Sequence, residues 1–119
     1  KAYGSLNVLE GIRKVHSEVS EKVWDSDVFV RSALVDAYIK CGNLRDGQEV
    51  FNGMSEQDLV SSNAMIDGYA QNALCSEAST LFMVMQHRGL FPDKVTFASM
   101  LKACASISSF HRGKLFLIL

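Results

Sequence analysis

The residue types that commonly bind metals are few in this sequence and do not cluster along it. The three cysteines form no Cys-x-x-Cys pair, and the three histidines form no His-x-x-x-His or His-x-Glu motif with them. These residues are Cys41, Cys75, Cys104, His16, His87 and His111. We therefore expect no metal site and no cofactor.

No group of residues suited to catalysis is present in the sequence either. A nucleophile with a base, two carboxylates at one site, or a glycine-rich phosphate loop would each form a recognisable arrangement. Gly53, Gly68 and Gly89 are instead isolated residues that suit turns or close packing. Asp36 and Asp67 occupy equivalent positions of a repeat, so they do not form a pair. The sequence predicts that this chain is not an enzyme.

Two acidic residues, Asp58 and Asp93, have a clear local role. Each stands just before a predicted helix. A carboxylate there can accept hydrogen bonds from free backbone N–H groups and interacts favourably with the helix dipole. The helices that position these acids follow a repeating pattern.

The stretch 59–93 contains two amphipathic helices and is the unit that the rest of the chain repeats. Apolar residues recur at helical spacing in each half of this stretch. They are Ala64, Met65, Ile66 and Tyr69 in the first half, and Ala78, Leu81, Phe82 and Met85 in the second. Asn72 and Ala73 interrupt the pattern between the helices. Gly89 and Pro92 follow the second helix as a left-handed cap and a helix-incompatible residue.

Comparison of this unit with the rest of the chain finds copies on both sides. Residues 28–58 are a shorter copy, and residues 94–119 are a truncated third copy. Residues 1–27 are the tail of a fourth, because KAYGSL matches KACASI. Both ends of the sequence fall inside a unit, so we expect the chain to be part of a longer array.

The repeats predict an all-α fold in which each hairpin buries its apolar face against its neighbours. The first helices are expected at roughly 1–5, 30–40, 61–71 and 96–106. The second helices are expected at roughly 8–21, 43–53, 74–87 and 109–119. In these repeats Cys75 aligns with Leu44 and Cys104 with Tyr69, so both cysteines are expected to be small core residues. An odd number of unpaired cysteines suits a reducing compartment.

The net charge weakly disfavours nonspecific binding to polyanions. The formal net charge is −1, which provides no overall positive field to attract nucleic acid or an anionic membrane. The first residues do not form a signal peptide, and no apolar run approaches the ~18 residues that usually cross a bilayer. We expect no membrane partner.

The repeat pattern resembles that of pentatricopeptide repeat proteins over essentially the whole chain. The features that carry the resemblance are the Ala-x-x-Asp-x-Tyr motif of the first helix, the x-Phe-x-x-Met motif of the second and the Gly-x-x-Pro-Asp ending. The mixed unit lengths are similar to those of the subclass found in plant organellar RNA-editing factors. By this resemblance 1–27 is the C-terminal part of a long-type repeat, 28–58 a short-type repeat, 59–93 a standard repeat and 94–119 a truncated long-type repeat.

The resemblance implies a right-handed superhelical solenoid of antiparallel helix-turn-helix repeats that binds single-stranded RNA, about one base per repeat. It implies a place in an organellar RNA-editing or processing factor, in a mitochondrion or chloroplast with the mitochondrion slightly favoured. An organellar transcript and other editing or processing proteins would be its partners.

In this family two residues of each repeat read one base together. At the matching positions, Ser32 and Asp58 would read guanine, and Asn63 and Asp93 would read uracil or less well cytosine. An amide offers a donor and an acceptor to a pyrimidine, whereas a hydroxyl and a carboxylate can accept from guanine N–H groups. The chain would read G followed by U. The residues expected to flank the bases are Phe29, Val60 and Val95, whereas Ala98 has no side chain for reading a base.

Other interpretations remain open for these residues. Asp58 and Asp93 could serve only as helix caps, and Ser32 and Asn63 could be polar residues of a first turn. Val60 and Val95 could simply pack. We assign Tyr38, Tyr69, Phe51 and Phe82 to the core, and nothing decides the place of Trp24.

Two other functions also remain open. Helical hairpins of similar period form scaffolds for protein-protein interaction. An editing enzyme is the second possibility, with a catalytic zinc domain beyond Leu119.

Overall fold

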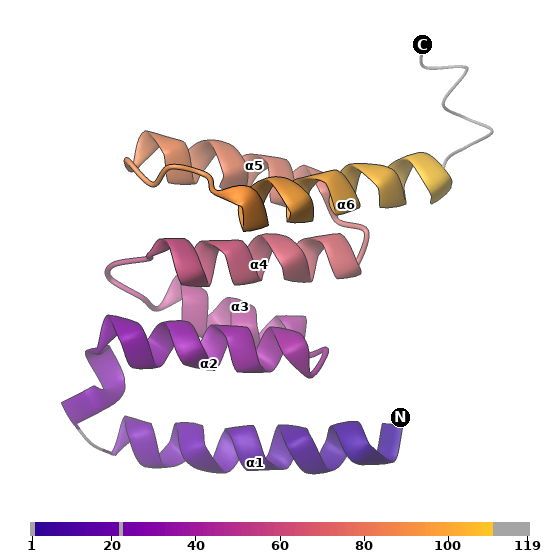
Figure 1. The fold of residues 1–119 in the computed structure, drawn as a ribbon. Coiled ribbons are helices and arrows are strands. Elements are labelled where there is room, and N and C mark those ends of the chain that lie inside the picture. Colours follow the sequence, from indigo (N-terminus) through magenta and orange to yellow (C-terminus); the bar gives the residue numbers. More distant parts are fainter. Residues whose placement is uncertain (1, 22, 111–119) are drawn as a thin grey trace. The chain divides into compact units, whose positions relative to one another are not determined.

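The computed structural model describes residues 2–21 and 23–110, and in these residues it contains helices and no strand (Figure 1). The helices are α1 (Ala2–Ser20), the short 3-10 helix η1 (Val23–Ser26), α2 (Val28–Lys40), α3 (Leu44–Asn52), α4 (Leu59–Gln71), α5 (Cys75–His87) and α6 (Lys94–Phe110). The predicted all-α helical-repeat fold is confirmed. None of the described helices has the length and apolar character that a bilayer crossing requires.

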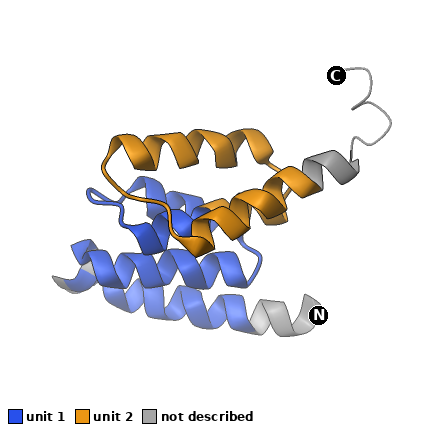
Figure 2. Cartoon of the chain, turned by 45° about the horizontal axis from the view of Figure 1, so that its top comes forward, with its two compact units in different colours: residues 1–65 blue, residues 66–119 orange. Residues whose placement is uncertain are grey.

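The chain divides into two compact units (Figure 2). Unit 1 is Lys1–Met65 and unit 2 is Ile66–Leu119. The boundary falls within α4, so that the first half of this helix belongs to unit 1 and the second half to unit 2.

The hairpin of unit 1 is formed by α2 and α3. Gly42 adopts a φ of 87°, a conformation that glycine reaches without steric cost. The Asn43 side chain then caps α3 by accepting a hydrogen bond from the N–H of Asp46. The N–H of Asn43 bonds back to the carbonyl of Tyr38 over 2.9 Å. These local bonds reverse the chain and start the second helix.

Burial of apolar side chains holds α2 and α3 together. The buried residues are Leu34, Val35, Tyr38 and Ile39 on α2, and Val50 and Phe51 on α3. Each such side chain contributes about 1.5–3 kcal/mol when it is fully removed from water. A Cβ at Gly47 would lie 3.0 Å from Cδ1 of Ile39, so the absence of a side chain there permits the close packing.

In unit 2 the turn between α4 and α5 uses a different residue. Ala73 has a φ of 57°, at the position equivalent to Gly42. Gly89 follows the end of α5 with a φ of 85°, and the N–H of Leu90 bonds to the carbonyl of Met85. This is the left-handed cap predicted from the sequence.

Helices α5 and α6 run antiparallel and pack against each other (Figure 1). The rings of Phe82 and Phe97 meet edge to face with their centroids 5.9 Å apart. Ala78 and Met85 of α5 and Ala103 of α6 are buried.

The sequence analysis was wrong about two turns. Helix α1 runs without a break through Asn7, where separate helices at 1–5 and 8–21 were predicted. Helix α6 likewise continues through Ser108 to Phe110, and the rest of the helix predicted at 109–119 lies outside the described residues. Asn7 and Ser108 are equivalent to Gly42 and Ala73. Neither is glycine, and a left-handed residue costs about 1–2 kcal/mol when it has a Cβ.

The predicted burial of the cysteines was also wrong in part. Cys104 is exposed and Cys75 is half-buried, although both were expected in the core. The apolar periodicity identified the correct helices but not the degree of exposure. Tyr38, Tyr69 and Phe51 are buried as predicted, whereas Phe82 is half-buried.

Candidate nucleic-acid interface

Three aspartates occupy the same position of the repeat, just before its first helix. The carboxylate of Asp27 accepts from the N–H of Val30 at 3.0 Å. Asp58 accepts from the N–H of Ser61 at 2.9 Å, and Asp93 accepts from the N–H of Thr96 at 3.1 Å. These acids therefore cap α2, α4 and α6, where the helix dipole favours negative charge.

Two of these caps are reciprocal. The N–H of Asp58 donates to Oγ of Ser61 over 3.1 Å, and the N–H of Asp93 donates to Oγ1 of Thr96 over 3.1 Å. Each acid is thus fixed both by its side chain and by its backbone. Asp58 and Asp93 therefore cap their helices as predicted.

Ser32 and Asp58 lie together in unit 1. The Ser32 hydroxyl donates to Oδ1 of Asp58 at 2.7 Å, although the two residues are far apart in sequence. Ser32 is 2% exposed and belongs to α2, whereas Asp58 is half-buried at the start of α4. The pair therefore joins the first helices of two successive repeats.

The ionised form of Asp58 is favoured at this site. Burial acts to raise its pKa, but the hydrogen bonds from Ser61 and Ser32 together outweigh burial, and the pKa lies below the ordinary value of 3.8. Asp58 consequently carries a negative charge at neutral pH. A carboxylate held in this way can accept hydrogen bonds but cannot donate them.

The two residues of the second predicted pair, Asn63 and Asp93, belong to different units. Asn63 is 8% exposed and lies on α4 within unit 1. Asp93 is exposed in unit 2, where its Oδ1 also lies 3.0 Å from the hydroxyl of Thr96. Asn63 is therefore more enclosed than a polar residue of an open first turn.

The three residues predicted to flank bases are exposed. Phe29 is 82% exposed, Val60 is 57% exposed and Val95 is 49% exposed. Val60 and Val95 therefore lie at the surface and not in the core. Each lies in the first turn of its helix, two residues after the capping aspartate. Large apolar side chains in water provide surfaces on which a base can pack.

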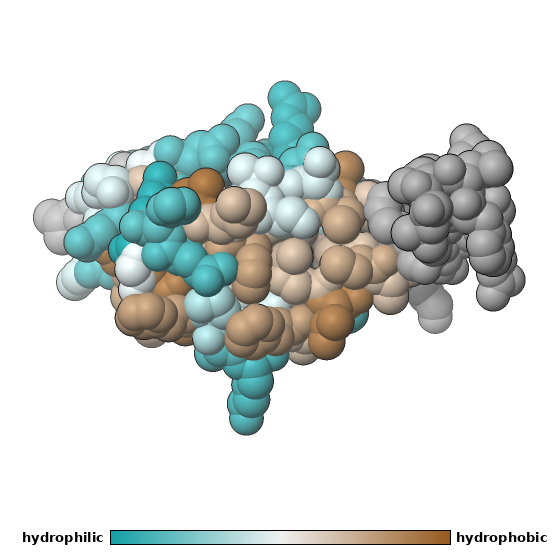
Figure 3. All heavy atoms as spheres, turned by 90° about the horizontal axis from the view of Figure 1, so that it is seen from above, coloured by the Kyte–Doolittle hydropathy of each residue, from teal (hydrophilic) through white to brown (hydrophobic). Residues whose placement is uncertain are grey.

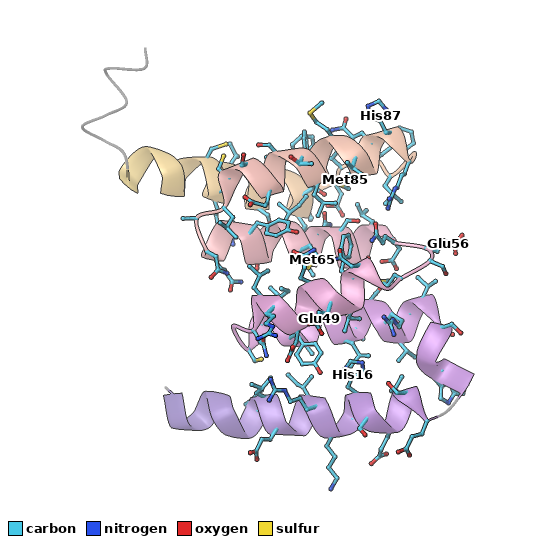
Figure 4. The ribbon with its side chains drawn as sticks, turned by 180° about the vertical axis from the view of Figure 1, so that it is seen from behind. His16, Glu49, Glu56, Met65, Met85 and His87 are labelled. Carbon is cyan, nitrogen blue, oxygen red and sulfur yellow. The ribbon has the colours of Figure 1, made fainter. Side chains whose placement is uncertain are left out.

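The sequence analysis did not single out Asp27. This residue stands at the position equivalent to Asp58 and Asp93, and that equivalence could have identified it. It also missed a polar cluster on α1, which includes His16 (Figure 4). Nδ1 of His16 lies 2.8 Å from the hydroxyl of Tyr38, and Arg13 forms a 3.0 Å ion pair with Asp46. Trp24 is 53% exposed within η1.

In the described part of the chain, no three potential ligands from histidine, cysteine, aspartate or glutamate come together as a metal site would require. Around Asp58 the structure instead brings together uncharged and acidic hydrogen-bonding groups, those of Ser32, Ser61 and Asp58 itself. This set suits the recognition of N–H and carbonyl groups.

Comparison with known proteins gives consistent matches along the chain. A model described as "PPR repeat" matches residues 29–59, and one described as "PPR repeat family" matches residues 57–106. The pentatricopeptide repeat-containing protein At2g13600 of Arabidopsis thaliana is 41% identical over 95% of this chain and 16% of its own length.

Two further Arabidopsis thaliana relatives carry an organelle in their names. The mitochondrial pentatricopeptide repeat-containing protein At3g53360 is 40% identical over 86% of this chain and 13% of its own length. The chloroplastic protein At4g18520 is 37% identical over 96% of this chain and 18% of its own length.

The chain thus spans less than a fifth of the length of these relatives. Their names support the expected organellar location and divide between the two organelles, so the preference for the mitochondrion stays a prediction. The mixed-length subclass also stays a prediction. The helical hairpins, the matched repeat models and the relatives agree, and the chain belongs to the pentatricopeptide repeat family.

Proposed function

We propose that this chain binds single-stranded RNA sequence-selectively, with about one base read per repeat. The observation that supports this most directly is the 2.7 Å hydrogen bond between Ser32 and Asp58. It places a hydroxyl and a carboxylate side by side, between the first helices of two repeats. The exposed side chains of Phe29 and Val60 belong to the same two helices.

The Ser32–Asp58 pair has the chemistry to read guanine. Oδ1 of Asp58 accepts from Ser32 and from the N–H of Ser61. In the proposal Oδ2 of Asp58 accepts from an N–H of guanine. The buried hydroxyl of Ser32 holds Oδ1 and so orients the carboxylate. Because the pKa of Asp58 is lowered, the carboxylate stays an acceptor over the whole neutral range.

The second base is assigned to Asn63 with Asp93. The amide of Asn63 offers both a donor and an acceptor, which suits the edge of uracil and less well that of cytosine. Val60 and Val95 are proposed to flank the base at this position. The RNA would then present a G followed by a U.

The decisive experiment changes Ser32 in an array long enough to bind RNA measurably. Repeats 28–58 and 59–93 would be placed within such an array, and Ser32→Asn compared with the parent on RNAs that differ at one base. We expect the preference at that base to move from G toward U. Ser76→Asn is the control, because Ser76 is exposed on α5 and should leave the preference unchanged. An unchanged preference in Ser32→Asn would reject the assignment.

Asp58→Asn gives an independent test of the same pair. Asparagine caps helices nearly as well as aspartate, so α4 should remain intact. It replaces an acceptor by an amide that also donates, so guanine should lose its advantage. Circular dichroism would verify the helix content, and a retained guanine preference in a folded variant would count against the proposed contact.

We further propose that the chain serves in an organellar RNA-editing or processing factor and that it carries no catalytic group of its own. The support is its family and the organelles in the names of its relatives. Sequencing of organellar transcripts from plants that lack the whole protein would test this. Loss of editing or processing at discrete sites is expected, and unaltered organellar transcripts would contradict it.

A scaffold for protein binding is the second candidate. It is favoured by the net charge of −1 and by exposed apolar side chains on α5 and α6, including Met83, Phe97 and Leu101. Apolar residues are visible on this side of the molecule (Figure 3). Binding that weakens strongly as salt rises would favour RNA, because contacts to phosphates release counterions. Salt-insensitive binding to a protein would favour the scaffold.

A further inference from the structure

The contact between Phe82 and Phe97 defines the register in which α5 and α6 pack against each other. In an antiparallel helix pair, facing residues have position numbers with a constant sum. Phe82 and Phe97 are in contact, with ring centroids 5.9 Å apart. Facing pairs should therefore recur every seven residues along both helices, which is two turns or about 10 Å.

Cys75 and Cys104 are the pair at that spacing. Cys75 lies seven residues before Phe82, and Cys104 lies seven residues after Phe97. The structure agrees with this register, since Cys75 lies close enough to Cys104 to raise the pKa of its thiol. The sequence alone gave no reason to join these cysteines, because their spacing matches no motif.

The thiols of Cys75 and Cys104 are accessible to small oxidants from solvent. Cys104 is exposed and Cys75 is half-buried, and both are free thiols. Cys75 is the first residue of α5, next to the turn that contains Ala73. Oxidation there requires no opening of the buried core around Ala78 and Met85.

We propose that Cys75 and Cys104 form an oxidative modification site, at which a peroxide converts the two thiols into a disulfide between α5 and α6. The bond would join the second helix of one repeat to the first helix of the next. It would therefore fix the packing of two successive repeats in unit 2.

The chemistry balances with one peroxide per disulfide. The thiolate of one cysteine attacks the O–O bond and becomes a sulfenic acid, and the peroxide leaves as hydroxide, which takes up a proton to give water. The second sulfur then attacks the sulfenic sulfur. The S–S bond forms, the S–O bond breaks, and the hydroxide that leaves takes up the remaining thiol proton to become a second water. Both sulfurs are oxidised and the peroxide oxygens are reduced.

The electrostatics at the pair predict how pH affects the rate. Burial, followed by the neighbouring Cys75, raises the pKa of the Cys104 thiol. Because the thiolate is the reacting form, oxidation should be slow at pH 7 and faster at pH 9. The disulfide should thus respond to sustained peroxide and resist brief exposure.

The proposed disulfide would lie away from the proposed base-reading residues. Cys104 is eleven residues from Asp93, or about 16 Å along α6. Oxidation should therefore act on the angle between the helices rather than on a contact to a base. This inference does not depend on the proposed RNA binding.

The test uses the chain with Cys41→Ser, so that only the two proposed partners carry thiols. Treatment with hydrogen peroxide should lower the mass by about 2 Da, the two hydrogens lost on disulfide formation. Proteolysis without reductant should yield one peptide that joins Cys75 to Cys104. The melting temperature should rise by about 5 °C or more and return on reduction.

The matched control is Cys75→Ser with Cys41 retained, because it also has two thiols. It should give no intramolecular disulfide, and circular dichroism would verify that it is folded. The proposal is overturned if the Cys41→Ser chain gains oxygen atoms or forms only dimers in place of losing hydrogens. A disulfide that lowers the melting temperature would also overturn it, because it would not fit the native packing.

Discussion

The hydroxyl of Tyr38 and Nδ1 of His16 lie 2.8 Å apart and connect α1 to α2. Their rings meet edge to face with centroids 5.7 Å apart. Tyr38 is 2% exposed, and burial followed by the nearby Asp46 carboxylate raises the pKa of its phenol. The phenol is therefore neutral at physiological pH.

Tyr38→Phe should lower the free energy of unfolding by about 0.5–1.5 kcal/mol, since it removes one hydrogen bond and keeps the ring. Urea denaturation followed by circular dichroism would measure this. His87→Ala is the control, because His87 is exposed on α5. If Tyr38→Phe proves as stable as the parent chain, the bond to His16 adds nothing to stability.

Ala73→Gly should stabilise the chain by about 0.5–1 kcal/mol. Ala73 has a φ of 57°, which is unfavourable for a residue with a Cβ and free of cost for glycine. The matched variant is Ala105→Gly on the exposed face of α6, which should destabilise by about 1 kcal/mol. Thermal unfolding of the two variants should therefore shift in opposite directions, and a shift in the same direction would contradict the turn geometry.

Asp58 should make stability depend on pH in the acid range. Its pKa is lower in the folded chain than the ordinary value of 3.8, so the folded state binds this proton less readily than the unfolded state does. The stabilisation is present above the ordinary value and is lost as the pH falls through the folded-state pKa. Asp58→Asn should flatten this part of the curve in urea titrations. Glu56→Gln is the control, because Glu56 is exposed. In this variant stability should still fall with decreasing pH, more steeply than it does in Asp58→Asn.

Two lysines offer a comparison of ion pairs. Lys102 lies 3.0 Å from Oδ1 of Asp67, which is otherwise enclosed and lacks another hydrogen-bond donor among the described residues. Lys40 pairs with Asp36 at 2.9 Å on the more exposed surface of one helix. Lys102→Met should cost about 1 kcal/mol and Lys40→Met about 0.3–0.5 kcal/mol. Equal losses in urea denaturation would show that the enclosure of Asp67 is unimportant.

The chain alone should bind RNA weakly. Two bases stacked at about 1–3 kcal/mol each provide about 2–6 kcal/mol, whereas micromolar affinity requires about 8 kcal/mol. Fluorescence anisotropy with a single-stranded RNA that contains GU should give a dissociation constant above about 1 μM at physiological salt. Submicromolar binding would mean that contacts other than the two base-reading pairs dominate.

The sequence by itself determined the helices, the repeats and the family. Apolar residues at helical spacing and the cap at Gly89 are local signals, and helix formation follows local signals closely. The capping role of Asp58 could be predicted for the same reason. The candidate reading residues came from positions within the repeat, which the sequence also displays.

Only the tertiary structure decided which of these groups meet. The bond from Ser32 to Asp58 and the register that brings Cys75 to Cys104 join residues of different helices. Such contacts depend on helix packing, which the periodicity of one helix does not specify. The unbroken helices through Asn7 and Ser108 have a related cause. A turn forms there only when packing of the second helix offsets the strain of a left-handed residue, and that packing energy is absent from the local sequence.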